Sequence, residues 1–147
     1  MRCVDVNVLV YAHRAESPDH DRYLGWLEAA RGADEPLGLS PTVLSGFLRV
    51  VTHPRIFREP TPLEVALEAV AVWRATPNAL ELKAGDRHFD IFTRLSRDAD
   101  ARGNLIPDAY LAALAVERGA TWYSADRSFA RFAGLDHRHP LDDHPTT

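Results

Sequence analysis

Short apolar segments alternate with longer helical segments along the whole chain, and this alternation constrains the fold more than any other feature. RCVDV, PLGLS, ALEL and TWYS have the length and composition of buried strands. Such alternation is typical of an α/β fold with a mainly parallel sheet, in which right-handed crossovers place helices on both faces. We therefore expect a three-layer α/β/α sandwich in a single domain spanning residues 1–147, with an irregular tail over roughly residues 136–147.

Local capping signals predict where the helices begin and end. Ser17 and Ser40 are each followed by proline, the arrangement of an N-cap before the first helical position. Thr61 and Glu64 have the spacing of a capping box, and Gly103 closes the segment that begins DRHFDIF. The segment NLIPDAYLAALAVERG predicts a further helix after its proline, apolar enough to be buried nearly all round.

Composition narrows the class of protein. The chain has 147 residues, of which 46% are hydrophobic and 26% charged, as in an ordinary globular domain. Cys3 is the only cysteine, which excludes an internal disulfide and a thiolate metal cluster. The start of the chain lacks the layout of a signal peptide, and no apolar run approaches the length of a membrane span. We expect a cytoplasmic protein without membrane contact.

Positive charge is unevenly distributed along the chain. The net charge of −4 argues against a general affinity for nucleic acid. A stretch without any acid nevertheless lies between Glu35 and Glu59, and it contains Arg49, His53, Arg55 and Arg58. Two interpretations stay open, a local patch that faces phosphates and an arginine-rich surface that is merely solvated.

Three aspartates fall where a strand ends or a helix begins. Asp5 lies between two valines in CVDVNVLV, Asp126 directly follows TWYS, and Asp108 opens the apolar helix. In a parallel α/β sheet the reactive crevice lies at the carboxyl ends of the strands. The three carboxylates are therefore expected to converge there, although they are far apart along the chain.

Each of these acids also has a structural interpretation. Asp108 suits the first turn of a helix, Asp5 suits a cap of the segment that follows it, and Asp126 suits a turn. Asp5 resists this interpretation most, because a charge among valines is unfavourable unless something compensates it. Three carboxylates held close together repel one another, and a divalent cation removes that repulsion. Oxygen ligands with open water positions suit Mg²⁺, with Mn²⁺ as a possible substitute, and such an ion orients a phosphodiester and activates water.

Four segments carry a resemblance to a known family. DVNVLVYAHR, FLRVVTHPRIF, IPDAYLAALAVERGA and SADRSFARF resemble, in order and spacing, the PIN-domain ribonucleases, specifically the VapC-type toxins of toxin–antitoxin pairs. The resemblance extends over essentially the whole chain. It implies a PIN-like α/β/α sandwich, Mg²⁺-dependent cleavage of RNA, a homodimer, and a small VapB-type antitoxin that blocks the site. Carried over position by position, it makes Asp5, Asp108 and Asp126 the catalytic, metal-binding acids.

Two departures from the family pattern bear on the site. The family usually has a glutamate on the helix corresponding to SPTVLSGFLRV, where this chain has Ser45 and Gly46. A further acid often stands two residues after the last aspartate, where this chain has Ser128. These departures bring a second metal ion and the strength of catalysis into question. They leave the first ion in place, since waters and substrate oxygens complete the coordination of Mg²⁺.

The resemblance also implies a mechanism. Asp5 and Asp108 are expected to be the main ligands, with Asp126 as a further or water-mediated ligand or as the group that orients the attacking water. Hydrolysis by a metal-activated water would leave a 5′-phosphate on a fragment of tRNA, rRNA or mRNA, with a single-stranded loop as the target. Arg49 and Arg55 are the predicted contacts to RNA phosphates.

Two other functions compete with this prediction. A PIN-like module that has lost catalysis and serves in binding is motivated by the missing glutamate. A phosphohydrolase of the haloacid-dehalogenase kind is suggested by DVNVLV, although Asn7 stands where that chemistry needs an aspartate and Lys83 is the only lysine. Separately, the tail has the composition of a transition-metal site or of an ordinary polar chain end, with His137, His139, Asp142, Asp143 and His144.

Overall fold

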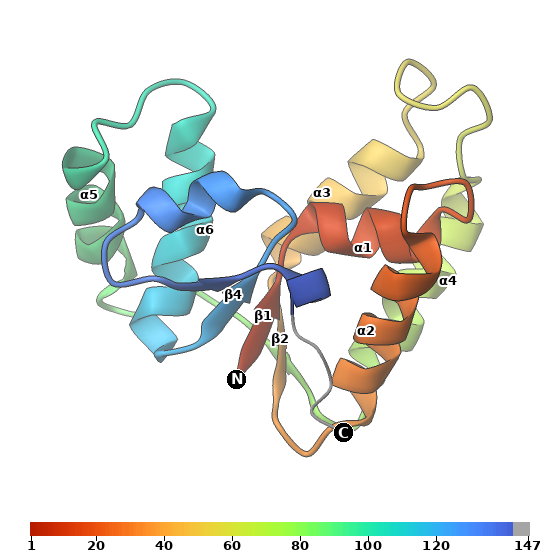
Figure 1. The fold of residues 1–147 in the computed structure, drawn as a ribbon, viewed down its shortest axis with the longest axis horizontal. Helices are drawn as coiled ribbons and strands as arrows, with labels where there is room; N and C mark the ends of the chain where they lie inside the picture. The colour runs from red at the N-terminus through yellow and green to blue at the C-terminus, as the bar shows by residue number, and fades with distance from the viewer. Residues whose placement is uncertain (143–147) are drawn as a thin grey trace.

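A parallel five-stranded sheet forms the centre of the computed structural model, which describes residues 1–142 (Figure 1). The strand order is β3-β2-β1-β4-β5, and every neighbouring pair is parallel. In the central strand, Cys3 pairs with Gly38 on one side and with Trp122 on the other. The strands are β1 (Arg2–Val4), β2 (Leu37–Leu39), β3 (Ala79–Glu81), β4 (Thr121–Tyr123) and β5 (Asp136–Arg138).

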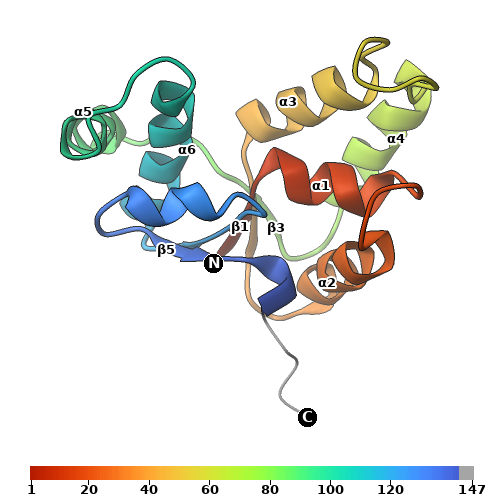
Figure 2. The same ribbon diagram turned by 45° about the horizontal axis from the view of Figure 1, so that its top comes forward.

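Helices cover both faces of this sheet. They are α1 (Val6–His13), α2 (His20–Gly32), α3 (Pro41–Val51), α4 (Leu63–Arg74), α5 (His88–Asp98) and α6 (Leu105–Arg118), with the 3-10 turns η1 (Arg127–Arg131) and η2 (Pro140–Asp142). The chain moves from β1 to β3 in one direction and then returns to β4, so right-handed crossovers place the two helix sets on opposite faces. Both views show α1 to α4 on one side and α5, α6 and η1 on the other (Figures 1 and 2). The predicted three-layer sandwich is confirmed.

The capping predictions have mixed outcomes. Ser40 caps α3 as predicted, since its hydroxyl accepts the Thr42 N–H at 3.2 Å. Helix α2 begins at His20 and not at the Ser17 signal, because the Ser17 N–H donates to the Arg14 carbonyl and continues the turn after α1. The predicted capping box at α4 is wrong, because the Thr61 hydroxyl contacts the His13 ring at 3.1 Å and leaves no side-chain cap.

The expected irregular tail is wrong as far as the structure describes it. Residues 136–138 form β5, which pairs in parallel with β4, and residues 140–142 form η2. The prediction failed because β5 is a short edge strand of charged and polar residues, without the apolar pattern of a buried strand. Its attachment is polar, since the Thr121 hydroxyl donates to Asp136 Oδ2 at 2.8 Å. Asp143 and His144 of the predicted tail lie outside the described residues.

Helix α6 packs its apolar surface into the core as predicted. Ala109 and residues 111–115 are buried, while Tyr110 and Val116 are partly exposed. Pro107 lies inside the first turn, so the helix begins two residues before it, at Leu105. This burial fixes the start of α6 close to the carboxyl edge of the sheet, where Asp108 lies. Among residues 1–142, no helix has both the length and the apolarity to cross a membrane.

Candidate active site

Asp5 is held by hydrogen bonds at the point where β1 passes into α1. It is the N-cap of α1, and its Oδ1 accepts the Val6 N–H at 2.7 Å. Its Oδ2 accepts the hydroxyl of the fully buried Ser124 at 2.7 Å. Asp5 itself is only 7% exposed, and burial raises the pKa of its carboxyl group against the opposing effect of these hydrogen bonds. The capping interpretation of Asp5 is therefore confirmed, and its charge still lies in a poorly solvated place.

A network of hydrogen bonds joins the turn after β1 to the turn after β4. The Asn7 amide donates to Ser124 Oγ at 3.2 Å and to Asp5 Oδ2 at 3.4 Å, while its carbonyl accepts the Ala125 N–H at 3.1 Å. The Asp126 N–H donates to Ser124 Oγ at 3.0 Å. The side chains of Asn7 and Ser124 thus fix the positions of Asp5 and Asp126 relative to each other. Sequence reasoning missed both, although each stands within two residues of a predicted acid.

Asp126 is the N-cap of η1 and is exposed. Its Oδ1 accepts the Ser128 N–H at 2.9 Å, and the Ser128 side chain also bonds to it, which lowers the pKa of Asp126. The turn interpretation of Asp126 is thus confirmed. Ser128, which replaces a possible further acid, serves to hold Asp126 in its charged form.

Asp108 lies in the first turn of α6 but does not cap it. Within residues 1–142 its carboxylate has no hydrogen-bond partner, and the N-cap position is taken by Asn104. Burial, followed by the negative charges of Asp5 and Asp126, raises the pKa of Asp108 to about 6. Because each of the three carboxylates lies in the field of another, they share one site at the carboxyl edge of the sheet. The structural interpretation of Asp108 as an acid in the first turn of the helix is therefore confirmed, although its side chain makes no capping hydrogen bond.

The donor set of the site fits a hard divalent cation held by few direct ligands. Within residues 1–142, no group of three His, Cys, Asp or Glu side chains is arranged to hold one metal ion. Mg²⁺ is commonly bound by one or two carboxylates and keeps several waters. The buried carboxylate of Asp5 and the unpartnered carboxylate of Asp108 suit this mode, whereas a cage with three direct ligands does not fit.

Packing of α1 against α3 leaves little space at Gly46, in the part of α3 where the family usually has a glutamate. Helices α1 and α3 approach so closely that a Cβ placed on Gly46 would lie 2.8 Å from Cγ2 of Val6. Carbon atoms do not pack at this distance without movement, and valine is stiff about its Cα–Cβ bond. An acidic side chain at residue 46 therefore has no room. The neighbouring Ser45 is exposed and carries no charge.

Two basic residues near the acids were not predicted. Arg131, at the end of η1, acts electrostatically on Asp108 and Asp126 and lowers the pKa of both. His137, on β5, lies with its Nε2 3.3 Å from the Ser124 carbonyl oxygen and lowers the pKa of Asp5 and Asp126. The only sequence signal for Arg131 was its place five residues after Asp126 in SADRSFARF. His137 had been considered only as part of a polar tail.

The structure does not bring Arg49 or Arg55 to the three acids. Arg49 lies in the last turn of α3, and Arg55 lies in the loop that follows. This loop contacts the far end of α1 from Asp5, because the Arg14 side chain donates to the Glu59 carbonyl at 2.9 Å. Both arginines are exposed. Contact between these two side chains and RNA stays a prediction.

The proposed transition-metal site in the tail finds no support in the described residues. His137, His139 and Asp142 do not form a metal-binding group, and Asp142 instead pairs with Arg127. Asp143 and His144 lie outside the described residues. Residues 136–142 are part of the ordered fold, since they form β5 and η2.

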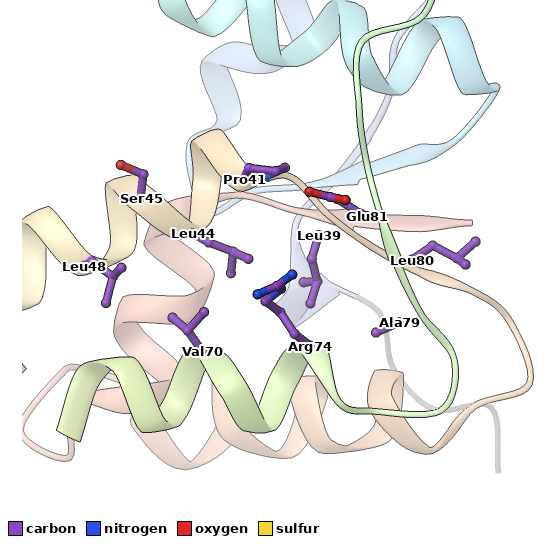
Figure 3. Close-up of a pocket in the computed structure, with 10 residues that line it drawn as sticks. All are labelled: Leu39, Pro41, Leu44, Ser45, Leu48, Val70, Arg74, Ala79, Leu80 and Glu81. Carbon is purple, nitrogen blue, oxygen red and sulfur yellow. The ribbon is translucent and has the colours of Figure 1, made fainter. Parts of the chain in front are cut away.

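A separate cavity of about 410 Å³ lies beside the edge strand β3. It is formed by α3, α4 and β3, and the guanidinium group of Arg74 points into it among leucine and valine side chains (Figure 3). Glu81 stands at the end of β3 beside this cavity and pairs with Lys83 at 3.2 Å. None of the three predicted acids lines it.

Comparison with known proteins agrees with this geometry. The model of the PIN domain matches residues 2–135. The chain is a PIN-domain protein of the VapC family. Ribonuclease VapC43 of Mycobacterium tuberculosis is 56% identical, over 97% of both chains. Ribonuclease VapC25 of the same organism is 41% identical, over 95% of this chain and 99% of that one.

A solved structure supports the family fold. The structure of VapBC2 from Rickettsia felis, bound to a DNA fragment from their promoter, matches 94% of this chain and 97% of that chain. The TM-score is 0.69 and the identity 18%, so this likeness shows the fold alone. Membership of the VapC family favours the ribonuclease interpretation over the alternative of a haloacid-dehalogenase-like phosphohydrolase.

Proposed function

We propose that this VapC-family protein is a divalent-metal-dependent endoribonuclease that acts as the toxin of a toxin–antitoxin pair. The observation that carries the proposal is the raised pKa of Asp108, whose charge is opposed by burial and by both Asp5 and Asp126. A carboxylate in this position is stabilised by a bound cation. The relatives that are named ribonucleases match nearly the whole chain, which supports cleavage of RNA as the reaction.

The chain contributes positioning and charge to this reaction. Asp5 and Asp108 would hold the ion directly, and Asp126 would act through water. When bound, Mg²⁺ supplies charge stabilisation to the phosphodiester and activates a water for attack. Hydrogen bonds from Val6 and Ser124 keep the Asp5 carboxylate in one orientation, and the exposed Asp126 orients the attacking water. Arg131 adds positive charge beside the acids, where the scissile phosphate must approach.

A partner protein and a second copy complete the proposal. The structural relative from Rickettsia felis is a VapBC pair, which supports a small VapB-type antitoxin that blocks the acidic site. We expect the toxin to form a homodimer and to act in the cytoplasm on tRNA, rRNA or mRNA.

RNA cleavage with and without metal tests the proposal. Purified protein free of antitoxin is expected to cut tRNA or rRNA in Mg²⁺ or Mn²⁺, to leave 5′-phosphate ends, and to stop in EDTA. Asp108→Asn should lower kcat about 10³-fold, because the ion contributes several kcal/mol to transition-state stabilisation. Asp98→Asn is the matched control, since this exposed aspartate pairs with Arg94 on the outer helix α5. Cleavage that persists in EDTA would contradict the metal mechanism.

A second candidate function rests on the closed position at residue 46. Because Val6 fills the space beside Gly46, the site lacks an acid that PIN nucleases commonly have. A catalytically weakened binding module is the alternative that this observation favours. It predicts RNA binding without cleavage in either Mg²⁺ or Mn²⁺, and the same assay therefore separates the two functions.

A further inference from the structure

A second pocket lies between η1, the end of β5 and η2, in the segment that follows Asp126. It has a volume of about 570 Å³. Most of its lining side chains are basic, in a protein whose net charge is −4. The lining residues are Arg127, Ala130, His137, Arg138, His139 and Asp142. Figure 1 shows η1, β5 and η2, the segments that carry these residues, in blue at the end of the coloured chain.

The pocket adjoins the candidate active site directly. Arg127 follows Asp126 in the chain, and the two residues form the start of η1. His137 contacts the carbonyl oxygen of Ser124 at 3.3 Å, and the hydroxyl of the same Ser124 donates to Asp5. Arg127 and His137 thus connect the pocket to the segments that carry Asp5 and Asp126.

The Arg127 guanidinium is already occupied by a carboxylate in a two-pronged arrangement. Its Nη1 lies 2.8 Å from Asp142 Oδ2, and its Nη2 lies 3.1 Å from Asp142 Oδ1. Two oxygens of a phosphate accept the same pair of parallel hydrogen bonds. Both side chains are exposed, at 66% and 59%, and an ion pair this exposed contributes little to stability. The pair is therefore easily exchanged for another anion.

We propose that Arg127 binds a backbone phosphate of single-stranded RNA in this pocket, and that Asp142 occupies the same guanidinium until RNA displaces it. The proposal rests on the proposed ribonuclease function and adds a named phosphate contact to it. Asp142 is then an internal competitor of the substrate. Since the binding-competent form is only a fraction of the free protein, the apparent affinity for RNA is reduced by that fraction.

RNA binding by a cycle of variants tests this competition. The probe is a short fluorescein-labelled single-stranded RNA of mixed sequence, whose anisotropy is followed in Mg²⁺ at several NaCl concentrations. All proteins carry Asp108→Asn to prevent cleavage. The variants are Arg127→Gln, Asp142→Asn and the combination of both. Arg118→Gln controls for the lost positive charge, because it lies at the other end of α6 from Asp108, and Glu28→Gln controls for the lost negative charge on α2.

We expect the effect of Asp142→Asn on RNA affinity to depend on whether Arg127 is present. Arg127→Gln should weaken binding about three- to ten-fold, and the salt slope should fall by about 0.7, the value for one contact to single-stranded nucleic acid. Asp142→Asn should strengthen binding by a similar factor. The combined variant should bind like Arg127→Gln alone, because the proposed competition of Asp142 with RNA takes place at the Arg127 guanidinium. Both controls should match the Asp108→Asn parent.

Three outcomes would overturn the proposal. Arg127→Gln that binds like Arg118→Gln shows that no phosphate contact exists at this residue. A gain from Asp142→Asn that persists undiminished in the combined variant shows long-range repulsion in place of competition. If wild-type protein cleaves RNA in Mg²⁺ under either outcome, the phosphate site fails and the ribonuclease function stands. Wild-type protein that neither binds nor cleaves RNA overturns both.

Discussion

The turn between β1 and α1 and the first turn of α6 each carry an acid of the candidate site, but they hold it in opposite ways. The Asp5 carboxylate accepts hydrogen bonds from Val6 and Ser124. The Asp108 carboxylate accepts none within residues 1–142, and its pKa is raised to about 6. The hydrogen bonds of Asp5 replace the water it loses on folding, whereas Asp108 loses water without replacement. Burial still raises the pKa of Asp5, but its hydrogen bonds offset part of that effect, whereas no hydrogen bond within residues 1–142 does so for Asp108. We therefore expect a bound cation to matter most for Asp108.

The largest expected effect on stability comes from removing the anchored acid. Asp5→Ala should lower the free energy of unfolding by about 3 kcal/mol, because it removes the cap of α1 and leaves the buried Ser124 hydroxyl without its acceptor. Asp108→Ala should change it by less than about 1 kcal/mol, since no hydrogen bond is lost. Urea denaturation in EDTA measures both, with Asp98→Ala as the surface control. If Asp5→Ala and Asp108→Ala lowered the free energy of unfolding equally, the hydrogen bonds of Asp5 would not distinguish the two acids.

Mg²⁺ should stabilise the folded protein through Asp108. At a concentration ten times its dissociation constant, Mg²⁺ should add ~1.4 kcal/mol to the free energy of unfolding, because it binds the folded state only. Thermal denaturation should then show a midpoint higher by a few degrees. Asp108→Asn should abolish this shift, whereas Asp98→Asn should keep it. A shift of the same size in Asp108→Asn would place the ion elsewhere.

The smallest effect is a pH dependence that belongs to Asp108. Its folded-state pKa of about 6 lies above the ordinary value of 3.8, so the folded protein holds a proton that the unfolded chain releases. In EDTA the free energy of unfolding should therefore fall as the pH rises from about 4 to about 6. Above that range Asp108 is ionised in both states, and the loss of stability has its full size. Screening of this partly exposed group limits the change to about 1 kcal/mol.

A comparison with Asp108→Asn isolates this effect, because the contributions of Asp5 and Asp126 are present in both proteins. The stability of the variant relative to wild type should rise over the same pH range, as urea denaturation at successive pH values would show. A constant difference between the two proteins would mean that the Asp108 pKa is not raised.

Much of the architecture was predictable from local patterns. The apolar strands, the Ser40 cap and the buried face of α6 are each encoded within a few neighbouring residues. The parallel order then places any acid at a strand end on the same edge, and for this reason Asp5, Asp108 and Asp126 could be predicted to lie together before the structure was known; their catalytic role stays a prediction. The edge strand β5 was missed because its polar sequence is held by backbone pairing, which leaves no hydrophobic pattern.

The parts of the site that were not predicted depend on contacts between distant segments. Asn7 and Ser124 are common polar residues, and their role exists only because β1 and β4 are neighbours. Thr61 looked like a helix cap and instead bonds to His13, since the loop before α4 folds back on α1. Neither the Asp142 contact of Arg127 nor the effect of Arg131 on the acids has a signature in spacing alone.

The close approach of Val6 to Gly46 has a consequence for how this site can change over time. An acid introduced at residue 46 meets the valine methyl group, and a smaller residue at position 6 alone leaves an empty space between α1 and α3. Each single step is unfavourable, and only the two together make room for an acid at residue 46. The packing of α1 against α3 therefore keeps residue 46 without an acid, and an additional acid in the candidate site arises more easily at another position.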